Sequence, residues 1–166
     1  MNWKDQVVLV TGGTGSFGKK FIKILLEEKQ PKKVIVFSRD ELKQHEMQVG
    51  GYNQENLRYF IGDIRDRERL ERALHGVDIV VHAAALKQVP ACEYNPMEAI
   101  KTNIMGTAHL LQALRGQPAL QAVLAITSDK VYANHETGAA FVEGDNLGGK
   151  DPYSASKAAT EIVVQS

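Results

Sequence analysis

The segment that decides the fold of this chain is VVLVTGGTGSFG, at residues 7–18. It begins with a β-branched run and continues into a glycine-rich loop. Apolar residues at helical spacing follow, namely Phe17, Phe21, Ile24 and Leu25. The order strand, loop, helix is typical of the first βαβ unit of a parallel sheet.

Four further apolar runs alternate with segments of helical period. Together the five runs cover residues 7–12, 33–38, 57–62, 78–84 and 122–127. Short buried strands that alternate with helices are typical of an α/β fold in which helices cover both faces of the sheet. We therefore expect a Rossmann-like, doubly wound parallel sheet of about five strands in the order 3-2-1-4-5.

Two helices are expected after the fourth run. The first begins with Asn95 as its capping residue and stops near Gly116. The second opens at Asp151 and Pro152 by the same capping logic and continues to Ser166 without a stop signal. Because such a helix normally leads into another strand, we expect the chain to end inside a βαβ unit.

The composition excludes several classes of protein. The chain has 166 residues, and its 20 Lys plus Arg balance its 20 Asp plus Glu, which does not favour a nucleic-acid partner. A single cysteine, Cys92, and the lack of an apolar run near the roughly 20 residues of a membrane span indicate a cytoplasmic protein with no membrane partner. We expect no metal site, because the histidines lack ligand spacing; they are His45, His75, His82, His109 and His135.

The loop after the first run has the chemistry of a phosphate-binding site. Gly12, Gly15 and Gly18 place a glycine at every third position, and Ser16 and Phe17 begin the helix. A backbone without Cβ atoms can turn tightly and let a pyrophosphate approach the positive end of a helix. The strand, loop, helix context favours a dinucleotide site over a purely structural loop.

The second run ends in residues that bear on the choice of dinucleotide. An NAD site usually has an acidic residue there, whereas this chain has Ser38 and Arg39, with Asp40 one place later. Arg39 can pair with a 2′-phosphate, so the residues favour NADP over NAD. The alternative is that Asp40 holds the ribose and that the cofactor is NAD.

Residues after the third and fourth runs complete the expected cofactor site. Asp63 and Ile64 stand where an adenine edge could be hydrogen-bonded and packed, although Asp63 could instead cap a helix that begins at Arg65. Ala83 and Ala84 follow the fourth run and are also expected to contact the cofactor.

A candidate catalytic group lies in the last third of the chain. Tyr153 and Lys157 are four residues apart and therefore share a helix face. A lysine ammonium beside a phenol favours the ionised phenol, which can act as a base. Ser128, Asp129 and Lys130 end the fifth run, at the edge where open α/β sheets bind their ligands.

These residues resemble the extended short-chain dehydrogenase/reductase family and, within it, the nucleotide-sugar 4,6-dehydratases. Residues 1–105, with TGGTGSFG, VFSRDELKQHEM, GDIRDRERL and HAAALKQVPACEYNPMEAIKTN, resemble the inverting UDP-N-acetylglucosamine 4,6-dehydratases. Residues 105–166, with MGTAHLLQALRG, ITSDKVYAN and GDNLGGKDPYSASKAATEIV, resemble CDP-glucose 4,6-dehydratase. The chain therefore reads as a mosaic, and a natural recombinant, an assembly artefact and an engineered chimera all stay open.

The resemblance implies roles for the five candidate catalytic residues. Tyr153 would remove the 4-hydroxyl proton of the sugar while carbon 4 gives a hydride to the nicotinamide, whose ribose Lys157 would hold. Lys130 would then take the proton from carbon 5, and Asp129 would release the 6-hydroxyl as water. Ser128 would hydrogen-bond the 4-oxygen.

The resemblance also implies partners and limits. Lys87 contacts the nucleotide-sugar substrate or is an ordinary surface lysine, and the helices at 95–116 and 151–166 are expected to form a homo-oligomer interface. Residues 1–166 correspond to an NAD(P)-binding domain without its C-terminal substrate domain. Two alternatives remain, namely a non-catalytic NADP(H)-binding module and a nucleotide-sugar 4-epimerase; the adjacent Asp129 and Lys130 argue against the epimerase.

Overall fold

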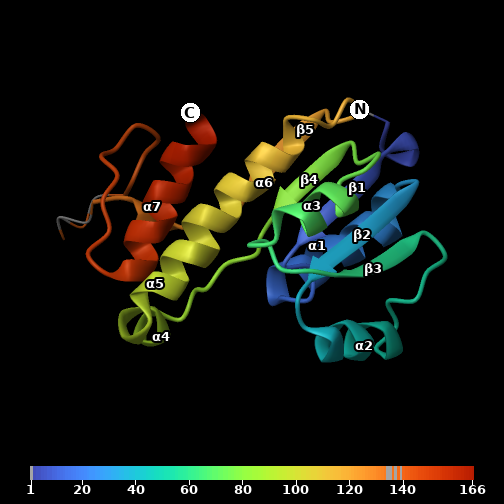
Figure 1. Cartoon of the computed structure of the whole chain (residues 1–166), viewed down its shortest axis with the longest axis horizontal. Coiled ribbons are helices and arrows are strands. Elements are labelled where there is room, and N and C mark those ends of the chain that lie inside the picture. The colour runs from blue at the N-terminus through green and yellow to red at the C-terminus, as the bar shows by residue number, and fades with distance from the viewer. Residues whose placement is uncertain (1, 134–135, 137, 139) are drawn as a thin grey trace.

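The strands form one parallel sheet, as the computed structural model in Figure 1 shows. The structure describes residues 2–133, 136, 138 and 140–166, so His135 lies outside the described part. The strands are β1 (Val7–Thr11), β2 (Lys33–Ser38), β3 (Leu57–Ile61), β4 (Ile79–His82) and β5 (Ala122–Ala125). Their order, β3-β2-β1-β4-β5, confirms the predicted topology.

The helices cover both faces of this sheet. The α-helices are α1 (Ser16–Ile24), α2 (Glu41–Val49), α3 (Arg67–Ala73), α4 (Val89–Tyr94), α5 (Pro96–Ala99), α6 (Gly106–Leu114) and α7 (Pro152–Gln165). Other helical turns are η1 (Trp3–Asp5), η2 (Leu25–Lys29), η3 (Ile100–Met105) and η4 (Asp129–Val131). Within the described ranges, no helix is both long enough and apolar enough to cross a membrane.

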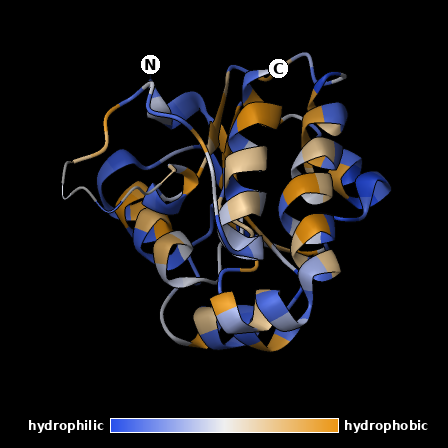
Figure 2. Cartoon of the chain, turned by 90° about the vertical axis from the view of Figure 1, so that its left-hand side faces the viewer, coloured by the Kyte–Doolittle hydropathy of each residue, from blue (hydrophilic) through white to orange (hydrophobic). Residues whose placement is uncertain are grey.

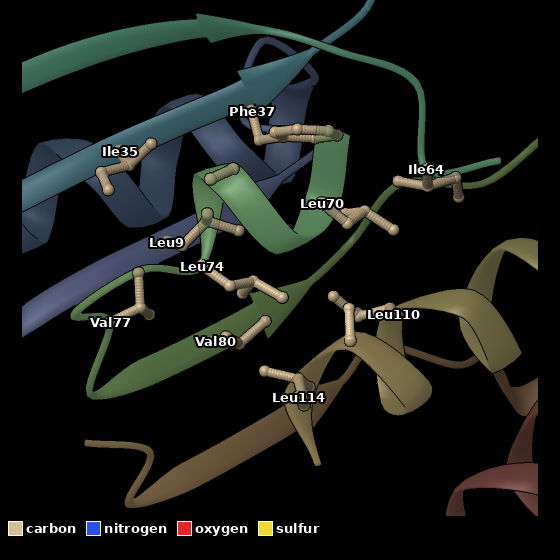
Figure 3. Close-up of a cluster of buried hydrophobic side chains, with 12 residues drawn as sticks. Leu9, Ile35, Phe37, Ile64, Leu70, Leu74, Val77, Val80, Leu110 and Leu114 are labelled. Carbon is tan, nitrogen blue, oxygen red and sulfur yellow. The ribbon is translucent and has the colours of Figure 1, made fainter. Parts of the chain in front are cut away.

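The core is divided by the sheet into two clusters. Leu9 of β1 contributes to the cluster beneath α3 and α6, which Figure 3 shows in close-up. Its neighbours Val8 and Val10 point to the opposite face and pack with Ile22 of α1 and Met47 of α2. Alternate residues of a strand face opposite sides, so a central strand covered on both sides is apolar throughout. Each such buried side chain stabilises the fold by about 1.5–3 kcal/mol.

The helix predicted from Asn95 to Gly116 is one continuous run in which α5 leads through the π-helical η3 into α6. The predicted helix start is confirmed, with Asn95 at the cap position before Pro96, but the side chain makes no cap bond, because its Nδ2 donates to the Ala91 carbonyl at 3.1 Å. The π-helical turn contains Asn103, and one wider turn changes which residues of a helix face its neighbours.

The capping prediction for the last helix is confirmed. Asp151 accepts a hydrogen bond from the Ser154 amide at 3.0 Å, and Pro152 is the first residue of α7. Burial raises the pKa of Asp151, and the bonds from Ser154 more than offset this effect, so the pKa lies below its ordinary value. The side chain of Asp151 is therefore ionised at neutral pH, as the positive end of the helix favours.

Candidate cofactor-binding and catalytic site

A pocket of about 430 Å³ lies along the carboxyl ends of the central strands and extends to α7. The structure brings together around it every residue predicted to bind the cofactor, namely Gly12, Gly15, Ser16, Phe17, Gly18, Ser38, Arg39, Asp63, Ile64, Ala83, Ala84, Tyr153 and Lys157. The exposed Lys87 also lines it. The predicted strand ends at Gly12, Gly62 and Ala84 overshoot the observed ones, because these residues belong to the loops that form the pocket.

The loop after β1 passes so close to its neighbours that only glycine fits at two positions. Gly12 has a φ of +65°, and a Cβ there would lie 2.8 Å from the Ala84 amide nitrogen. A Cβ on Gly18 would lie 2.5 Å from the Gly13 Cα. The helix that follows has no side-chain cap, so the N–H groups of its first turn are left for another acceptor. The loop therefore fits a pyrophosphate group.

The end of the pocket formed by β2 carries two cations, Arg39 and Lys43, beside two carboxylates, Asp40 and Asp63. Arg39 is exposed there, and Lys43 from α2 also lines the pocket, although sequence reasoning missed it. Asp40 caps α2, since its Oδ1 accepts a hydrogen bond from the Lys43 amide at 3.0 Å, and this bond is the main cause that lowers the pKa of Asp40. The cap occupies one oxygen of the carboxylate, while Lys43 Nζ lies 3.4 Å from the other.

The carboxylate of Asp63 is held by neighbouring arginines. Arg65 Nη2 lies 2.7 Å from Asp63 Oδ2, and Arg39 Nη1 lies 3.9 Å from the same atom. Partial burial raises the pKa of Asp63, but hydrogen bonds from Arg65 outweigh it and leave the pKa below its ordinary value. The alternative of Asp63 as a helix cap is wrong: α3 begins at Arg67, and its cap is Asp66.

Lys157 is the buried cation at the other end of the pocket. Its Nζ donates a hydrogen bond to the Ile126 carbonyl at 2.8 Å, and burial lowers its pKa to about 8. Tyr153, one turn earlier on α7, is half-buried and lines the pocket beside it. The structure therefore places the predicted tyrosine and lysine on the pocket side of one helix.

Thr102 is a pocket residue that sequence reasoning missed. It is 6% exposed, and its Oγ1 is buried with no hydrogen-bond partner among the described residues. The neighbouring Asn103 has a structural role, because its side chain binds both the N–H and the C=O of Leu86, at 2.8 and 2.9 Å. The signal that could have found Thr102 is this pair of polar residues inside an apolar stripe.

Ser128, Asp129 and Lys130 form the start of η4, which packs against α7. Ser128 Oγ donates to Asp129 Oδ1 at 2.9 Å and accepts from the Lys130 amide at 3.2 Å. The side chains of Asp129 and Lys130 are exposed, and none of the three residues lines the pocket. The structure thus does not bring this group into the pocket that Tyr153 and Lys157 share.

Among the described residues, neither the cysteine nor the potential metal ligands form a second candidate site. Cys92 is buried, and burial raises the pKa of its thiol, as suits a packing residue. No cluster of three or more potential metal-ligating side chains occurs in the part of the chain that the structure describes.

A glycine-rich loop and a tyrosine–lysine helix that line one pocket, on a parallel five-stranded sheet, are typical of the extended short-chain dehydrogenase/reductase family. The chain belongs to the family described as polysaccharide biosynthesis protein, which matches residues 8–140. Its homologues are nucleotide-sugar 4,6-dehydratases and epimerases.

Three of these proteins illustrate the similarity. The chain is 53% identical over 123 residues to the inverting UDP-N-acetylglucosamine 4,6-dehydratase of Campylobacter jejuni, which covers 74% of this chain and 36% of that protein. It is 42% identical over 131 residues to the UDP-glucose 4-epimerase of Rickettsia rickettsii, with 77% and 38% covered. The structure of the dTDP-glucose 4,6-dehydratase DesIV from Streptomyces venezuelae, solved with NAD bound, matches with a TM-score of 0.85 and 32% identity over 96% of this chain and 51% of that one.

The chain thus spans between about a third and a half of the length of the proteins that it matches. The predicted similarity to UDP-N-acetylglucosamine 4,6-dehydratases is confirmed, over 123 residues of the chain. The resemblance of residues 105–166 to CDP-glucose 4,6-dehydratase stays a prediction.

Proposed function

We propose that this chain binds a nicotinamide dinucleotide and forms the cofactor-binding part of a nucleotide-sugar 4,6-dehydratase. The observation that carries the proposal is the single pocket that joins the phosphate loop at Gly12 to Tyr153 and Lys157. The close approach of Gly12 to Ala84 and the uncapped first turn of α1 suit a pyrophosphate. The similar dehydratase from Streptomyces venezuelae was solved with NAD.

The proposed cofactor is NADP(H) rather than NAD(H). Arg39 and Lys43 both line the end of the pocket where the adenosine ribose would lie, and Asp40 is engaged as a helix cap. A 2′-phosphate needs cationic partners, whereas an unmodified ribose is usually held by a carboxylate. Arg39 is close enough to Asp63 to form an ion pair, and a phosphate would be a more highly charged partner.

In the proposed reaction the cofactor would accept hydride, and side chains of the protein would transfer protons. A bound nicotinamide dinucleotide supplies a reversible acceptor of hydride from the sugar. Tyr153 takes the proton of the sugar hydroxyl, and the adjacent Lys157 favours the ionised phenol and holds the ribose. In the proposed dehydration, Lys130 removes the proton on carbon 5 and Asp129 protonates the departing hydroxyl; Ser128 bonds the 4-oxygen. Lys87, at the pocket rim, is the proposed contact to the nucleotide-sugar.

A 4-epimerase is the second candidate, and one observation favours it. Asp129 and Lys130 are exposed and do not line the pocket, whereas Tyr153 and Lys157 do. Epimerisation at carbon 4 needs a base and a hydride acceptor but no acid and base for loss of water. The relative from Rickettsia rickettsii is a UDP-glucose 4-epimerase.

The proposed partner for assembly is a second copy of the chain. Apolar side chains are exposed on the helices α4 to η3 and on α7, and Figure 2 shows apolar residues on this side of the molecule. They are Tyr94, Met97, Ile100, Met105 and Ile162. An exposed apolar face of this kind is typical of an interface, and a two-fold dimer would bury it against its own copy. The measurement is the molar mass in solution as a function of concentration.

The test of the proposed function is a titration of the full chain with NADPH and NADH, followed by calorimetry. We expect saturable binding that Lys157→Met weakens, while the matched variant Lys32→Met, exposed at the amino end of β2 and away from the pocket, binds as the unmodified chain does. The absence of binding by the unmodified chain would overturn the proposal. Product analysis with a UDP-sugar then separates a 4-keto-6-deoxy product from a carbon-4 epimer.

A further inference from the structure

His82, the last residue of β4, is a buried titratable group that the proposed chemistry does not use. It is 3% exposed and lies between two hydroxyl groups. Its Nδ1 is 2.7 Å from Thr11 Oγ1, and its Nε2 is 3.0 Å from Thr107 Oγ1. Through these two contacts the ring connects the end of β1 with α6, which are far apart in the sequence.

The neighbours of Thr11 determine which ring nitrogen carries the hydrogen. Thr11 Oγ1 accepts hydrogen bonds from the amides of Ala83 and Ala84, both at 3.2 Å. A hydroxyl oxygen has two lone pairs and one hydrogen, so the remaining hydrogen of Thr11 is directed to His82 Nδ1. Nδ1 is therefore an acceptor, and the hydrogen of the neutral ring lies on Nε2.

The other side of the ring agrees with this assignment. Thr107 Oγ1 donates its own hydrogen to the Asn103 carbonyl at 2.6 Å, so it is free to accept from His82 Nε2. Every hydrogen bond from Ala84 through Thr11 and His82 to Asn103 thus has a defined donor and acceptor. A buried network in which each member is satisfied holds one arrangement in preference to others.

This network connects the glycine-rich loop at Gly12 with α7, both of which line the pocket. Thr11 immediately precedes Gly12 of the phosphate loop, and Ala84 lines the pocket. At the other end, Asn103 Nδ2 donates to Ser156 Oγ at 2.8 Å, and Ser156 Oγ donates to the Tyr153 carbonyl at 2.7 Å. The chain of contacts therefore runs from the phosphate loop, beneath the pocket, to the helix that carries the tyrosine.

We propose that His82, as the neutral Nε2–H tautomer, is a positioning residue that holds the phosphate loop and α7 in register for a dinucleotide. The inference rests on the proposed binding of a nicotinamide dinucleotide. Burial, and secondarily the charge of Lys157, lower the pKa of His82 to about 3, which agrees with a neutral ring. His82 acts through Thr11 and Thr107, and it does not line the pocket itself.

The tautomer is tested first, on the full chain without ligand. Long-range proton–nitrogen correlation spectra distinguish a ring nitrogen that carries hydrogen from one that does not. We expect the Nε2–H pattern for His82. A pattern with the hydrogen on Nδ1, or an average of both tautomers, would overturn the proposal.

The positioning role is tested with Thr107→Val, which removes the acceptor of Nε2–H, and with Thr107→Ser, which keeps it. We expect Thr107→Val to speed amide exchange of Ala84, whose N–H is bonded to Thr11 Oγ1, and to weaken NADPH binding by about three- to tenfold. Thr107→Ser restores both. The control for general destabilisation is Leu110→Val, a core residue one turn further along α6, which changes neither readout.

The outcomes separate this inference from the proposed function. If the unmodified chain binds no dinucleotide, the proposed function fails, and the positioning role for a dinucleotide fails with it, while the tautomer and Ala84 exchange still report whether the network exists. If NADPH binds but Thr107→Val leaves its affinity unchanged, the proposed function stands and the positioning role is wrong. Equal weakening by Leu110→Val would also overturn the positioning role, because loss of stability would then explain the effect.

Discussion

Strands β1 and β5 both end near the candidate site, but their surroundings differ. β1 is paired on both sides, by β2 and β4, and Val8, Leu9 and Val10 are fully buried. β5 pairs with β4, and Leu124 in it is 52% exposed. The loop after β1 therefore follows a strand that is buried and paired on both sides, while the Ser128–Lys130 segment follows a strand at the edge of the sheet.

The difference indicates that the proposed binding and the proposed acid–base chemistry depend on regions that are packed to different degrees. The glycine-rich loop that would hold a dinucleotide follows a strand that is paired on both sides, and a Cβ at Gly12 would clash with Ala84. Asp129 and Lys130, by contrast, are exposed and face water. Exposed charges interact weakly because water screens them. Four predictions test this contrast, beginning with the reaction itself.

The largest expected effect concerns turnover. We expect the 166-residue chain to form no detectable 4-keto-6-deoxy product from UDP-N-acetylglucosamine or CDP-glucose, even at high enzyme concentration. Alignment of the reacting groups supplies about 7–11 kcal/mol of a barrier, and acid–base catalysis only about 10²- to 10⁴-fold. With Asp129 and Lys130 outside the pocket, that alignment is lacking. Robust turnover that Tyr153→Phe abolishes would show that the chain aligns Asp129 and Lys130 with the reacting groups after all.

The second prediction concerns the end of the pocket at Arg39, where the adenosine ribose would lie. We expect the chain to bind NADPH about ten- to a hundredfold more tightly than NADH, because a charge-assisted contact of Arg39 with a phosphate is worth about 1.5–3 kcal/mol. Arg39→Ala should remove this preference in parallel calorimetric titrations. Arg67→Ala, which removes an exposed arginine paired with Glu71 on α3, is the matched control. Equal affinities for NADPH and NADH in the unmodified chain would instead favour NAD as the cofactor, with Asp40 holding its ribose.

The third prediction uses the buried histidine beneath the phosphate loop. Burial lowers the pKa of His82 to about 3 in the folded chain, whereas it is near 6.5 when unfolded. Below about pH 6.5 the unfolded chain thus takes up a proton that the folded chain does not. The free energy of unfolding should fall by about 2 kcal/mol between about pH 7.5 and about pH 5, measured by urea denaturation.

The control for this pH dependence is a histidine in water. His75 is exposed, so His75→Gln should leave the pH dependence unchanged, whereas His82→Gln should flatten it. If His82→Gln fails to fold, the ring carbon shift of His82 in the unmodified chain provides the measurement. A titration of that shift near pH 6.5 would show that the site under the phosphate loop is open to water, and the contrast with β5 would be lost.

The parts of the fold that follow from local pattern could be predicted from the sequence. Alternating apolar runs gave the five strands and their order, and Asp151 followed by Pro152 gave the start of α7. Asn95 takes the cap position without a side-chain cap bond, because the preceding α4 supplies the Ala91 carbonyl, to which the Asn95 amide donates instead. Hydrophobic periodicity predicts where a helix lies, but it cannot predict this hydrogen bond between Asn95 and the preceding helix.

In the site, too, the residues that follow from local sequence pattern were predicted, and those that depend on irregular turns were not. The glycine spacing and the pair of Tyr153 and Lys157 placed residues around one pocket, since the glycines follow a strand and the pair shares one helix face. The position of Asp129 and Lys130 depends on the short η4 turn after an edge strand, which neither residue encodes. Thr102 was missed because the π-helical turn of η3, which no spacing rule anticipates, shapes that part of the helix.

The smallest expected effect concerns Thr102 and tests whether its buried hydroxyl binds the ligand. Its buried Oγ1 has no hydrogen-bond partner in the described residues, so removing it costs the free chain little. We expect Thr102→Val to keep the stability of the chain but to weaken NADPH binding by about 0.5–1.5 kcal/mol, roughly two- to tenfold, since a bound ligand would lose one hydrogen bond. Thr102→Ser should retain full affinity. Unchanged affinity in Thr102→Val would mean that a bound ligand does not reach this buried hydroxyl.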